Sequence, residues 1–325
     1  MLPQRVLVTG ANGLVGRELV ARLGVFREYD VLATGSGPPR LGGARASGGY
    51  APLDITDADA VRRLMLDFAP TTVVNCAAMT NVDACELDPP RCWQVNSDAV
   101  ETLADHCRRT GARLVQVSTD FVFDGLAGAL YPETARPSPL SSYARSKHAA
   151  ENHARGAGLD RWAVARTALV FGMPGTGHDD TDSVSDSASA LAGRSNVVLW
   201  LLDRLTRGER TSVVTDQWRT PSYAPDVADG LERIVRYGKT GVFHLAGREY
   251  LSVYDLGLRV ARVFGLDASC LAPTENFRQP AARPPRTGLL ILRAESELGY
   301  RPRSLDDALR DLGRRLGIPV AAPEP

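Results

Sequence analysis

The sequence predicts an α/β protein built on a doubly wound parallel sheet, with a smaller, mostly helical domain appended to it. Two observations lead to this fold class. The first half of the chain alternates short, almost uninterrupted apolar runs with longer segments of helical periodicity, which is the pattern of parallel strands buried on both faces and of the helices that connect them. The chain also has 325 residues, which exceeds the size at which a single hydrophobic core stops growing.

The predicted strands are short and rich in Val and Leu. They cover residues 5–10, 30–35, 71–78, 112–119 and 162–172. Between them lie helix candidates at 14–24, 57–68, 91–110 and 142–157, and a further helix is expected near 197–208. Strands and helices in alternation, joined by right-handed crossovers, give a doubly wound sheet.

Three glycines follow the first predicted strand, in the stretch TGANGLVGRELV, where a helix is expected to begin. Glycine permits a tight turn, a close approach of the backbone to a pyrophosphate and close packing of helix on strand, while free N–H groups at the helix start face the phosphates. The sequence therefore predicts a Rossmann-like dinucleotide site at this turn. The expected cofactor contacts are Gly10, Asn12, Gly13, Leu14, Val15 and Gly16.

The end of the second predicted strand, ATGSGPPR, should meet the adenosine ribose of the dinucleotide. Proteins that bind NAD place an acidic residue there, which accepts a hydrogen bond from the 2′-hydroxyl. This stretch has no acid, and Asp30 lies too early, at the start of the strand. Ser36 and Arg40 would instead suit a 2′-phosphate, so NADPH is favoured and NADH is the alternative cofactor.

The stretch SSYARSKHAAE, residues 141–151, contains Lys147, one of only two lysines among 38 Lys and Arg residues. Tyr143 and Lys147 are four residues apart on a predicted helix, so both side chains project from one face. A phenol with a pKa of about 10 is a poor proton relay at neutral pH, and a nearby ammonium lowers that pKa by favouring the phenolate. We therefore expect Lys147 to lower the pKa of Tyr143; the alternative is an exposed helix pair without a chemical role.

After Gly172 the pattern changes to a stretch rich in Gly, Ser and Asp that can bury little apolar surface. The sequence therefore predicts three parts. Residues 1–172 together with about 213–247 form the dinucleotide-binding domain, 173–212 form a flexible loop and a substrate-side helix, and 248–325 form the smaller substrate domain.

Several motifs resemble those of the extended short-chain dehydrogenase/reductases, namely RVLVTGANGLVG, VVNCAAMTNVDACE, VSTDFVFDG, SSYARSKHAAE and TDQWRTPSYAPDVA. As a set they resemble the dTDP-4-dehydrorhamnose reductase branch, together with its relative, the regulatory beta subunit of methionine adenosyltransferase. The resemblance implies an NADP(H)-dependent reductase that acts on the 4-keto group of a nucleotide-linked deoxysugar. In such an enzyme Tyr143 donates the proton, Lys147 tunes Tyr143 and Thr119 stabilises the reacting oxygen. Ser118 should point to the opposite side of the extended strand.

The resemblance also assigns residues to the two ligands. On the cofactor side it adds Asp54 and Ile55 beside the adenine, and Cys76, Ala77 and Ala78 beside the diphosphate and ribose. On the sugar side it assigns contacts to Thr80, Val82, Thr119, Asp120, Phe121, Leu169, Gln217 and Arg219. Arg283 or Arg286 would meet the nucleotide diphosphate through bidentate contacts. A homodimer through the helices at 91–110 and 142–157 is common in the family.

Two residues depart from the pattern of the rhamnose-forming enzymes. Phe121 stands where an aromatic hydroxyl is usual, and Leu169 stands where a tryptophan is usual. An aliphatic residue at the second place resembles the methionine adenosyltransferase subunit, so a non-catalytic, dinucleotide-binding regulatory subunit is the alternative function. A related nucleotide-sugar epimerase or dehydratase is a third, although dehydratases of the family usually have Asp-Glu after the threonine, whereas Asp120 is followed here by Phe121.

Composition limits the classes of partner. The formal net charge is zero and the pI is about 7.0, which supplies no basic field for nucleic acid and no polybasic patch for a membrane. Five cysteines without a C-x-x-C motif suggest reduced thiols, and the chain starts with no leader pattern, so we expect a cytoplasmic protein. His148 and His153 are five residues apart with no acidic cluster beside them, so no catalytic metal is expected.

Overall fold

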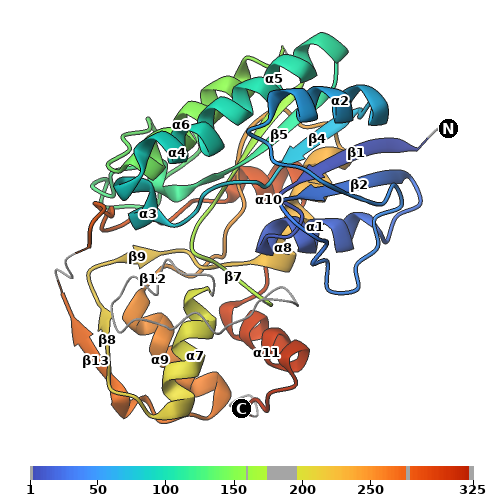
Figure 1. Cartoon of the computed structure of the whole chain (residues 1–325). Coiled ribbons are helices and arrows are strands. Elements are labelled where there is room, and N and C mark those ends of the chain that lie inside the picture. The colour runs from blue at the N-terminus through green and yellow to red at the C-terminus, as the bar shows by residue number, and fades with distance from the viewer. Residues whose placement is uncertain (1–2, 159, 174–195, 276–278, 322–325) are drawn as a thin grey trace.

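The computed structural model describes residues 3–158, 160–173, 196–275 and 279–321 (Figure 1). Its main feature is a seven-stranded parallel sheet with the strand order β11-β6-β5-β4-β1-β2-β3. The strands are β1 Gln4–Thr9, β2 Tyr29–Gly35, β3 Tyr50–Pro52, β4 Thr72–Asn75, β5 Arg113–Thr119, β6 Trp162–Thr167 and β11 Gly241–His244. The predicted doubly wound α/β fold is confirmed.

Helices cover both faces of this sheet (Figure 1). One face carries α2 Ala58–Phe68, α5 Ala99–Thr110 and α6 Ser142–Arg155, and the other carries α1 Leu14–Leu23, α8 Ala224–Arg236 and α10 Leu292–Leu298. Leu7 on β1 packs with the first group, whereas Val6 and Val8 pack with the second, because successive side chains of a strand point to opposite faces. Strands buried on both sides explain why the sequence reads as nearly continuous apolar runs.

The strand order reverses between β1 and β4, since the chain runs outward from β1 through β2 and β3 before it returns to β4. In sheets of this kind, ligands bind outside the carboxyl ends of the strands at this reversal. Gly10 follows β1 there and Cys76 follows β4, so the fold brings the predicted cofactor loops to one edge of the sheet.

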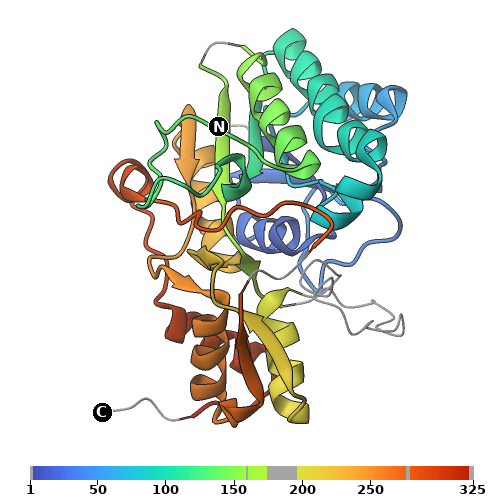
Figure 2. The same cartoon turned by 90° about the vertical axis from the view of Figure 1, so that its left-hand side faces the viewer.

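A second hydrophobic cluster forms the lower part of the molecule in Figures 1 and 2. It contains α7 Val197–Arg207, α9 Val253–Phe264 and α11 Leu305–Leu316, with the parallel pair β8 Thr211–Val214 and β13 Leu271–Thr274. Val213 and Val214, which the sequence analysis placed with the dinucleotide domain, pack in this second cluster, whereas α10 packs on the sheet beside α8. The division of the chain by function stays a prediction, and residues 174–195 of the expected flexible loop lie outside the described residues.

Shorter elements connect the two parts. Two strand pairs, β7 Val170–Phe171 with β10 Ser222–Tyr223 and β9 Trp218–Arg219 with β12 Leu251–Ser252, lie outside the main sheet. The other helical segments are α3 Val82–Leu87, α4 Pro89–Trp93, a π-helical turn at Gln94–Asp98, and 3-10 turns at Asp120–Val122 and Ala268–Cys270. Within the described ranges, every helix is too short or too polar to cross a membrane.

Two predicted elements need correction, and one strand was missed. The run 162–172 is not one strand, because Leu169 has a left-handed backbone with a φ of 43° and β7 leaves the sheet to pair with β10. The single helix predicted over 91–110 is α4, the π-helical turn and α5 in succession. Strand β3 was not predicted, since it is a three-residue edge strand that follows a glycine-rich loop without an apolar run.

Candidate active site

The predicted dinucleotide turn joins β1 to α1 and leaves no room for a Cβ at Gly10 or Gly16. Gly10 has a φ of 65°, and a Cβ on it would lie 2.5 Å from the Ala77 nitrogen. A Cβ on Gly16 would collide with the Gly10 carbonyl oxygen. Gly13 is the N-cap of α1 and offers no side chain to cap it. The backbone can therefore approach a diphosphate closely, and the uncapped N–H groups and dipole of α1 suit its negative charge, so the turn fits a dinucleotide.

Asn12 ties this turn to the loop after β2. Its side-chain nitrogen donates to the carbonyl oxygens of Ser36 (3.1 Å) and Pro38 (3.0 Å), and its oxygen accepts from the Arg40 N–H (2.8 Å). Tyr50 on β3 also accepts from Asn12, at 2.9 Å. The Arg40 Nε is buried without a hydrogen-bond partner among the described residues. The structure thus brings Ser36 and Arg40 beside the glycine turn, through bonds of Asn12 and Tyr50 that the sequence analysis missed.

A buried polar chain crosses the sheet near the carboxyl ends of three strands. The Thr9 hydroxyl on β1 donates to Asn75 Oδ1 on β4 (2.5 Å), and Asn75 Nδ2 donates to Gln116 Oε1 on β5 (2.8 Å). Asn75 also accepts from the Ala77 N–H at 3.2 Å, which fixes the loop after β4. The sequence analysis missed this chain, whose only signal was a polar residue at the end of an apolar strand.

The other predicted cofactor contacts lie on the loops after β3 and β4. Asp54 accepts from the N–H (2.9 Å) and hydroxyl (2.7 Å) of Thr56, and these bonds hold the pKa of its carboxyl below the ordinary value. Ile55 is buried in the core. Desolvation raises the pKa of the Cys76 thiol to about 12, with the charge of Lys147 acting against this rise. Lys147 therefore lies near the loop that follows β4.

Thr119, Tyr143 and Lys147 come together where β5 ends against the start of α6. Ser141 caps this helix by accepting from the Ala144 N–H (3.3 Å), which starts α6 just before Tyr143. Only 9% of Tyr143 and 3% of Lys147 is exposed. Lys147 Nζ donates to the carbonyl oxygen of Val117 on β5 (2.7 Å), which holds the ammonium against the strand that ends in Thr119.

In this structure the net shift of the Tyr143 pKa is upward, whereas the sequence analysis expected Lys147 to lower it. Desolvation raises the pKa of the Tyr143 phenol; a hydrogen bond with Thr119 opposes this rise, and the carboxylate of Asp120 adds to it. Desolvation also lowers the pKa of the Lys147 ammonium to about 8, with Glu151 acting in the opposite direction. Tyr143 therefore keeps its proton at neutral pH, which is the state of a proton donor.

A buried ion pair stands behind these residues and fixes α6 on the sheet. Ser118 faces away from Thr119, as predicted, and its hydroxyl donates to Glu151 Oε1 (2.7 Å). Arg166 on β6 donates to both oxygens of the same carboxylate, from Nε (2.8 Å) and Nη2 (2.7 Å). Burial acts to raise the pKa of Glu151, but the hydrogen bonds and charge of Arg166 bring it to about 2. Glu151 follows Lys147 by one helical turn, and the sequence analysis gave it no role.

Asn96, in the π-helical turn, joins the loop after β4 to α6. Its Oδ1 accepts from the Met79 N–H (2.8 Å), and its Nδ2 donates to the Ser146 hydroxyl (3.1 Å). Ser146 in turn donates to the carbonyl oxygen of Tyr143 (2.8 Å). This contact was also missed, because no local pattern marks an asparagine inside a helical run as a partner of a serine 50 residues later.

Phe121, Arg219 and Asp120 form the predicted sugar side of the site. The Phe121 ring meets Tyr143 edge to face, with 6.2 Å between ring centres, and the Arg219 guanidinium lies 5.1 Å above Phe121. Arg219 Nε is 3.5 Å from Asp120 Oδ2, and both side chains are 3% exposed. Burial raises the pKa of Asp120, and the charge of Arg219 opposes this. The wall beside the Tyr143 ring is therefore apolar, with a buried ion pair behind it.

Arg283 and Arg286 differ, although the sequence analysis treated them as equivalent. Arg283 donates from Nη1 (2.7 Å) and Nη2 (2.8 Å) to the two oxygens of Asp83, and its side chain is 8% exposed. The predicted bidentate contact of Arg283 with a diphosphate is therefore not available in this structure. Arg286 is exposed, and its guanidinium stacks 5.9 Å from the Trp218 ring centre without a hydrogen-bond partner in the described part of the chain.

The remaining predicted sugar contacts lie in three different places. Val82 is buried in a cluster with Tyr143, whereas Thr80 is exposed. Leu169 packs against the second hydrophobic cluster. Gln217 is half-buried, and its carbonyl oxygen accepts from the Val253 N–H at the start of α9 (3.1 Å). Of these four residues, the structure thus brings Val82 into one cluster with Tyr143.

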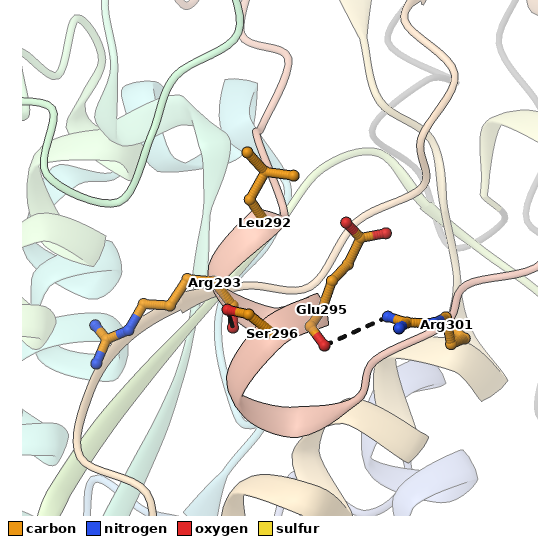
Figure 3. A pocket seen from close by; sticks show the side chains of 5 residues that line it. All are labelled: Leu292, Arg293, Glu295, Ser296 and Arg301. Carbon is orange, nitrogen blue, oxygen red and sulfur yellow. Dashed lines mark hydrogen bonds between the residues drawn. The ribbon is translucent and has the colours of Figure 1, made fainter.

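A surface pocket at α10 contains none of the predicted site residues. It is lined by Leu292, Arg293, Glu295, Ser296 and Arg301 (Figure 3). Arg301 donates to the Glu295 carbonyl oxygen (3.3 Å), while the Arg293 side chain points away from both and pairs with Glu297. Among the residues that the structure describes, no group of three or more His, Cys, Asp or Glu side chains could hold a metal ion.

Comparison with known proteins identifies the family. The model of the RmlD substrate binding domain matches residues 4–317. The chain belongs to this family. The predicted resemblance to the dTDP-4-dehydrorhamnose reductase branch of the extended short-chain dehydrogenase/reductases is therefore confirmed. The match spans both hydrophobic clusters of the structure, so the family fold includes the smaller helical part as well as the sheet.

Individual relatives cover nearly the whole chain. A probable low-salt glycan biosynthesis reductase from Haloferax volcanii is 33% identical over 94% of this chain and 96% of its own length. A dTDP-4-keto-6-deoxy-D-glucose reductase from Streptomyces niveus is 32% identical over 85% of this chain and 84% of its own.

Solved structures agree with the fold. A dTDP-4-dehydrorhamnose reductase from Clostridium acetobutylicum has 28% identity and a TM-score of 0.81, covering 97% of this chain and 100% of that one. One from Bacillus anthracis, in complex with NADP, has 23% identity and a TM-score of 0.80 with the same coverage.

Proposed function

We propose that this protein is an NADP(H)-dependent reductase that converts the 4-keto group of a nucleotide-linked deoxysugar to an alcohol, as a dTDP-4-dehydrorhamnose reductase does. The observation that carries the proposal is the buried group of Thr119, Tyr143 and Lys147 near the glycine turn. Relatives named as dTDP-4-keto-6-deoxy-D-glucose reductase and dTDP-4-dehydrorhamnose reductase, each 32% identical, support the choice of substrate.

Each residue of this site would have its own role in the reaction. The glycine turn and the loops after β2 and β4 would hold the dinucleotide, which supplies the hydride when bound. Tyr143 holds its proton at neutral pH because its pKa is raised, so it can donate that proton to the oxygen of the reduced carbonyl. The Thr119 hydroxyl stabilises the charge that develops on this oxygen. The buried Lys147 ammonium then stabilises the phenolate that Tyr143 becomes.

NADPH is the proposed form of the cofactor, and NADH is the alternative. Ser36 and Arg40 lie beside the glycine turn, and the end of β2 carries no acid that would accept from a ribose 2′-hydroxyl. The buried, unpartnered Nε of Arg40 is a donor for a 2′-phosphate. The Bacillus anthracis neighbour, which contains NADP, also supports NADPH.

The diphosphate of the nucleotide sugar would meet Arg286, whose guanidinium is exposed. Val82 and Phe121 would face the sugar, and the keto carbon of the sugar ring would lie above Tyr143. We further propose a homodimer, for which the family resemblance is the support and light scattering the test. A cytoplasmic location is supported by five cysteines that are all free.

The test is NADPH oxidation with dTDP-4-keto-6-deoxyhexoses, comparing the wild type with Tyr143→Phe. We expect the variant to bind NADPH normally and to lose about 10³-fold in kcat, because it lacks the proton donor. Tyr237→Phe, at a residue that is 51% exposed, is the matched control and should leave kcat unchanged. Equal turnover by wild type and Tyr143→Phe would refute the catalytic role. NADPH binding without turnover of any keto sugar would instead favour the regulatory subunit.

A further inference from the structure

A strap formed by residues 281–287 crosses the sugar side of the site. Its second half is held by Arg219, which donates to the carbonyl oxygens of Pro284 (2.7 Å) and Pro285 (3.0 Å). The Thr287 hydroxyl donates to Asp120, and the Trp218 N–H donates to Pro285 (2.7 Å). This half of the strap is therefore fixed by side chains and backbone together.

The first half of the strap depends on one carboxylate. Asp83, in the first turn of α3, accepts from the Ala281 N–H (3.0 Å) and from both Nη atoms of Arg283 (2.7 and 2.8 Å). Within the described ranges, every hydrogen bond that ties residues 281–283 to the rest of the molecule ends on Asp83. The pair is nearly closed to solvent, with side-chain exposures of 7% for Asp83 and 8% for Arg283.

The same half of the strap packs near Tyr143. Ala281 is 2% exposed and packs in one cluster with Tyr143 and with Val82, Cys85 and Cys92 of α3 and α4. Asp83 follows Val82 directly, so the carboxylate that holds Ala281 stands beside an apolar residue of the same cluster. The bidentate pair thus holds the strap against α3 at the cluster that contains Tyr143.

We propose that Asp83 and Arg283 are positioning residues whose pair latches the strap over Tyr143 and thereby sets the affinity for the keto sugar. The inference rests on the proposed function for its kinetic consequence, but the latch itself is a property of the free protein. In this arrangement Arg283 holds the strap, and Arg286 on the same strap meets the anionic part of the substrate. In the part of the chain that the structure describes, no hydrogen bond or ion pair joins Asp83 or Arg283 to the cofactor turn, so the latch should act on the sugar and not on the dinucleotide.

Removal of one partner of a buried pair leaves the other charge buried and unpaired, which strongly favours a local conformation that exposes it. We therefore expect Asp83→Asn and Arg283→Met to increase the opening of residues 281–283 by about tenfold or more. The opening should be local, because the second half of the strap keeps its own hydrogen bonds to Arg219, Asp120 and Trp218.

Amide hydrogen exchange of the full-length protein without ligands tests the latch itself. The Ala281 amide should exchange about tenfold faster or more in Asp83→Asn, while the peptides that cover β5 and α6 keep their wild-type rates. Asp203→Asn and Arg207→Met are the matched controls, since they break an ion pair on α7 whose side chains are 45% and 62% exposed. Unchanged exchange at residues 281–283 in Asp83→Asn would overturn the proposal.

Steady-state kinetics test what the latch does. Asp83→Asn and Arg283→Met should raise KM for the keto sugar about tenfold, change kcat by less than about threefold, and leave the Kd of NADPH unchanged. A loss of kcat with an unchanged KM, or a weaker affinity for NADPH, would contradict a positioning role on the sugar side. Arg283→Lys keeps the charge but loses the fork, so it should give a smaller rise in KM and serves if the other variants do not fold.

The two proposals can fail separately. If the wild type reduces no keto sugar, the proposed function fails, while the exchange experiment still decides whether the latch exists. If the wild type is active and the Asp83 and Arg283 variants match it in KM and in exchange, the latch fails and the proposed function stands.

Discussion

The glycine turn at residues 10–16 and the strap at residues 281–287 both belong to the candidate site but are built in different ways. The turn is made of backbone: its fit depends on the absence of a Cβ at Gly10 and Gly16, against atoms of its own loop and of the loop after β4. The strap is held by hydrogen bonds from distant parts of the chain, such as those between Asp83 and Arg283, which are 200 residues apart.

This difference explains which region could be predicted. A tight turn before a helix requires glycine for local steric reasons, so its pattern is visible in a short stretch of sequence. A salt bridge requires only two opposite charges, and this chain has 38 of each sign. Only the fold decides which of these charges meet. In this structure Arg283 pairs with Asp83, so it does not offer both of its Nη atoms to a ligand.

The largest effect on the turn is expected from Gly10→Ala. A left-handed backbone costs a residue with a Cβ about 1–2 kcal/mol, and the contact with Ala77 adds a further cost of about 1–3 kcal/mol. Urea unfolding should show this loss of stability, and NADPH should bind more weakly. Gly43→Ala is the control, because Gly43 also has a positive φ but no atom within 4 Å of its Cβ position; it should lose only the first of these two contributions. Equal losses in the two variants would show that close packing at Gly10 is unimportant.

The pH dependence that Lys147 gives to the free energy of unfolding tests whether the cofactor side of the site also depends on tertiary packing. The pKa of its ammonium is about 8 in the folded protein and about 10.4 in an unfolded chain. Between these values the unfolded chain binds a proton that the folded protein does not, so the contribution of Lys147 to the free energy of unfolding rises with pH, by roughly 3 kcal/mol in all. Below pH 8 the Lys147 ammonium is charged in both the folded and the unfolded state, so the free energy of unfolding is reduced by the full cost of burying this charge.

The measurement for Lys147 is the free energy of unfolding in urea at several pH values from 7 to 10.5, for the wild type and for Lys147→Met. The wild-type value minus the variant value should increase over the window from about pH 8 to about pH 10.5. A constant difference would mean that the Lys147 ammonium is not desolvated in the folded protein, which would contradict its burial beside Tyr143.

The smallest effect is expected from Arg40→Gln, which addresses the choice of cofactor. Loss of a charge-assisted contact with the 2′-phosphate should raise the Kd of NADPH about tenfold and leave that of NADH unchanged. Titration of both dinucleotides against protein fluorescence measures this. Asp83→Asn is the control on the strap side, and it should change the Kd of neither dinucleotide. An equal effect of Arg40→Gln on both dinucleotides would remove Arg40 from the 2′-phosphate site.

Most of the fold was predictable, and part of the site was. Parallel strands buried on both faces must be apolar throughout, so β1, β2, β4, β5 and β6 were visible as runs. The i, i+4 spacing correctly placed Tyr143 and Lys147 on one helix face. The bend at Leu169 and the edge strand β3 were missed, because the first is a single strained residue inside an apolar run and the second has only three residues.

The sequence by itself determined the alternation of strands and helices, the glycine turn, and the placement of Tyr143 and Lys147 on one helix, because each depends on residues close together in the chain. The tertiary structure decided how these two residues titrate: desolvation, a property of the packed molecule, raises the pKa of Tyr143 and lowers that of Lys147. It also decided the partner of Arg283, since a long-range ion pair exists only after the chain has folded.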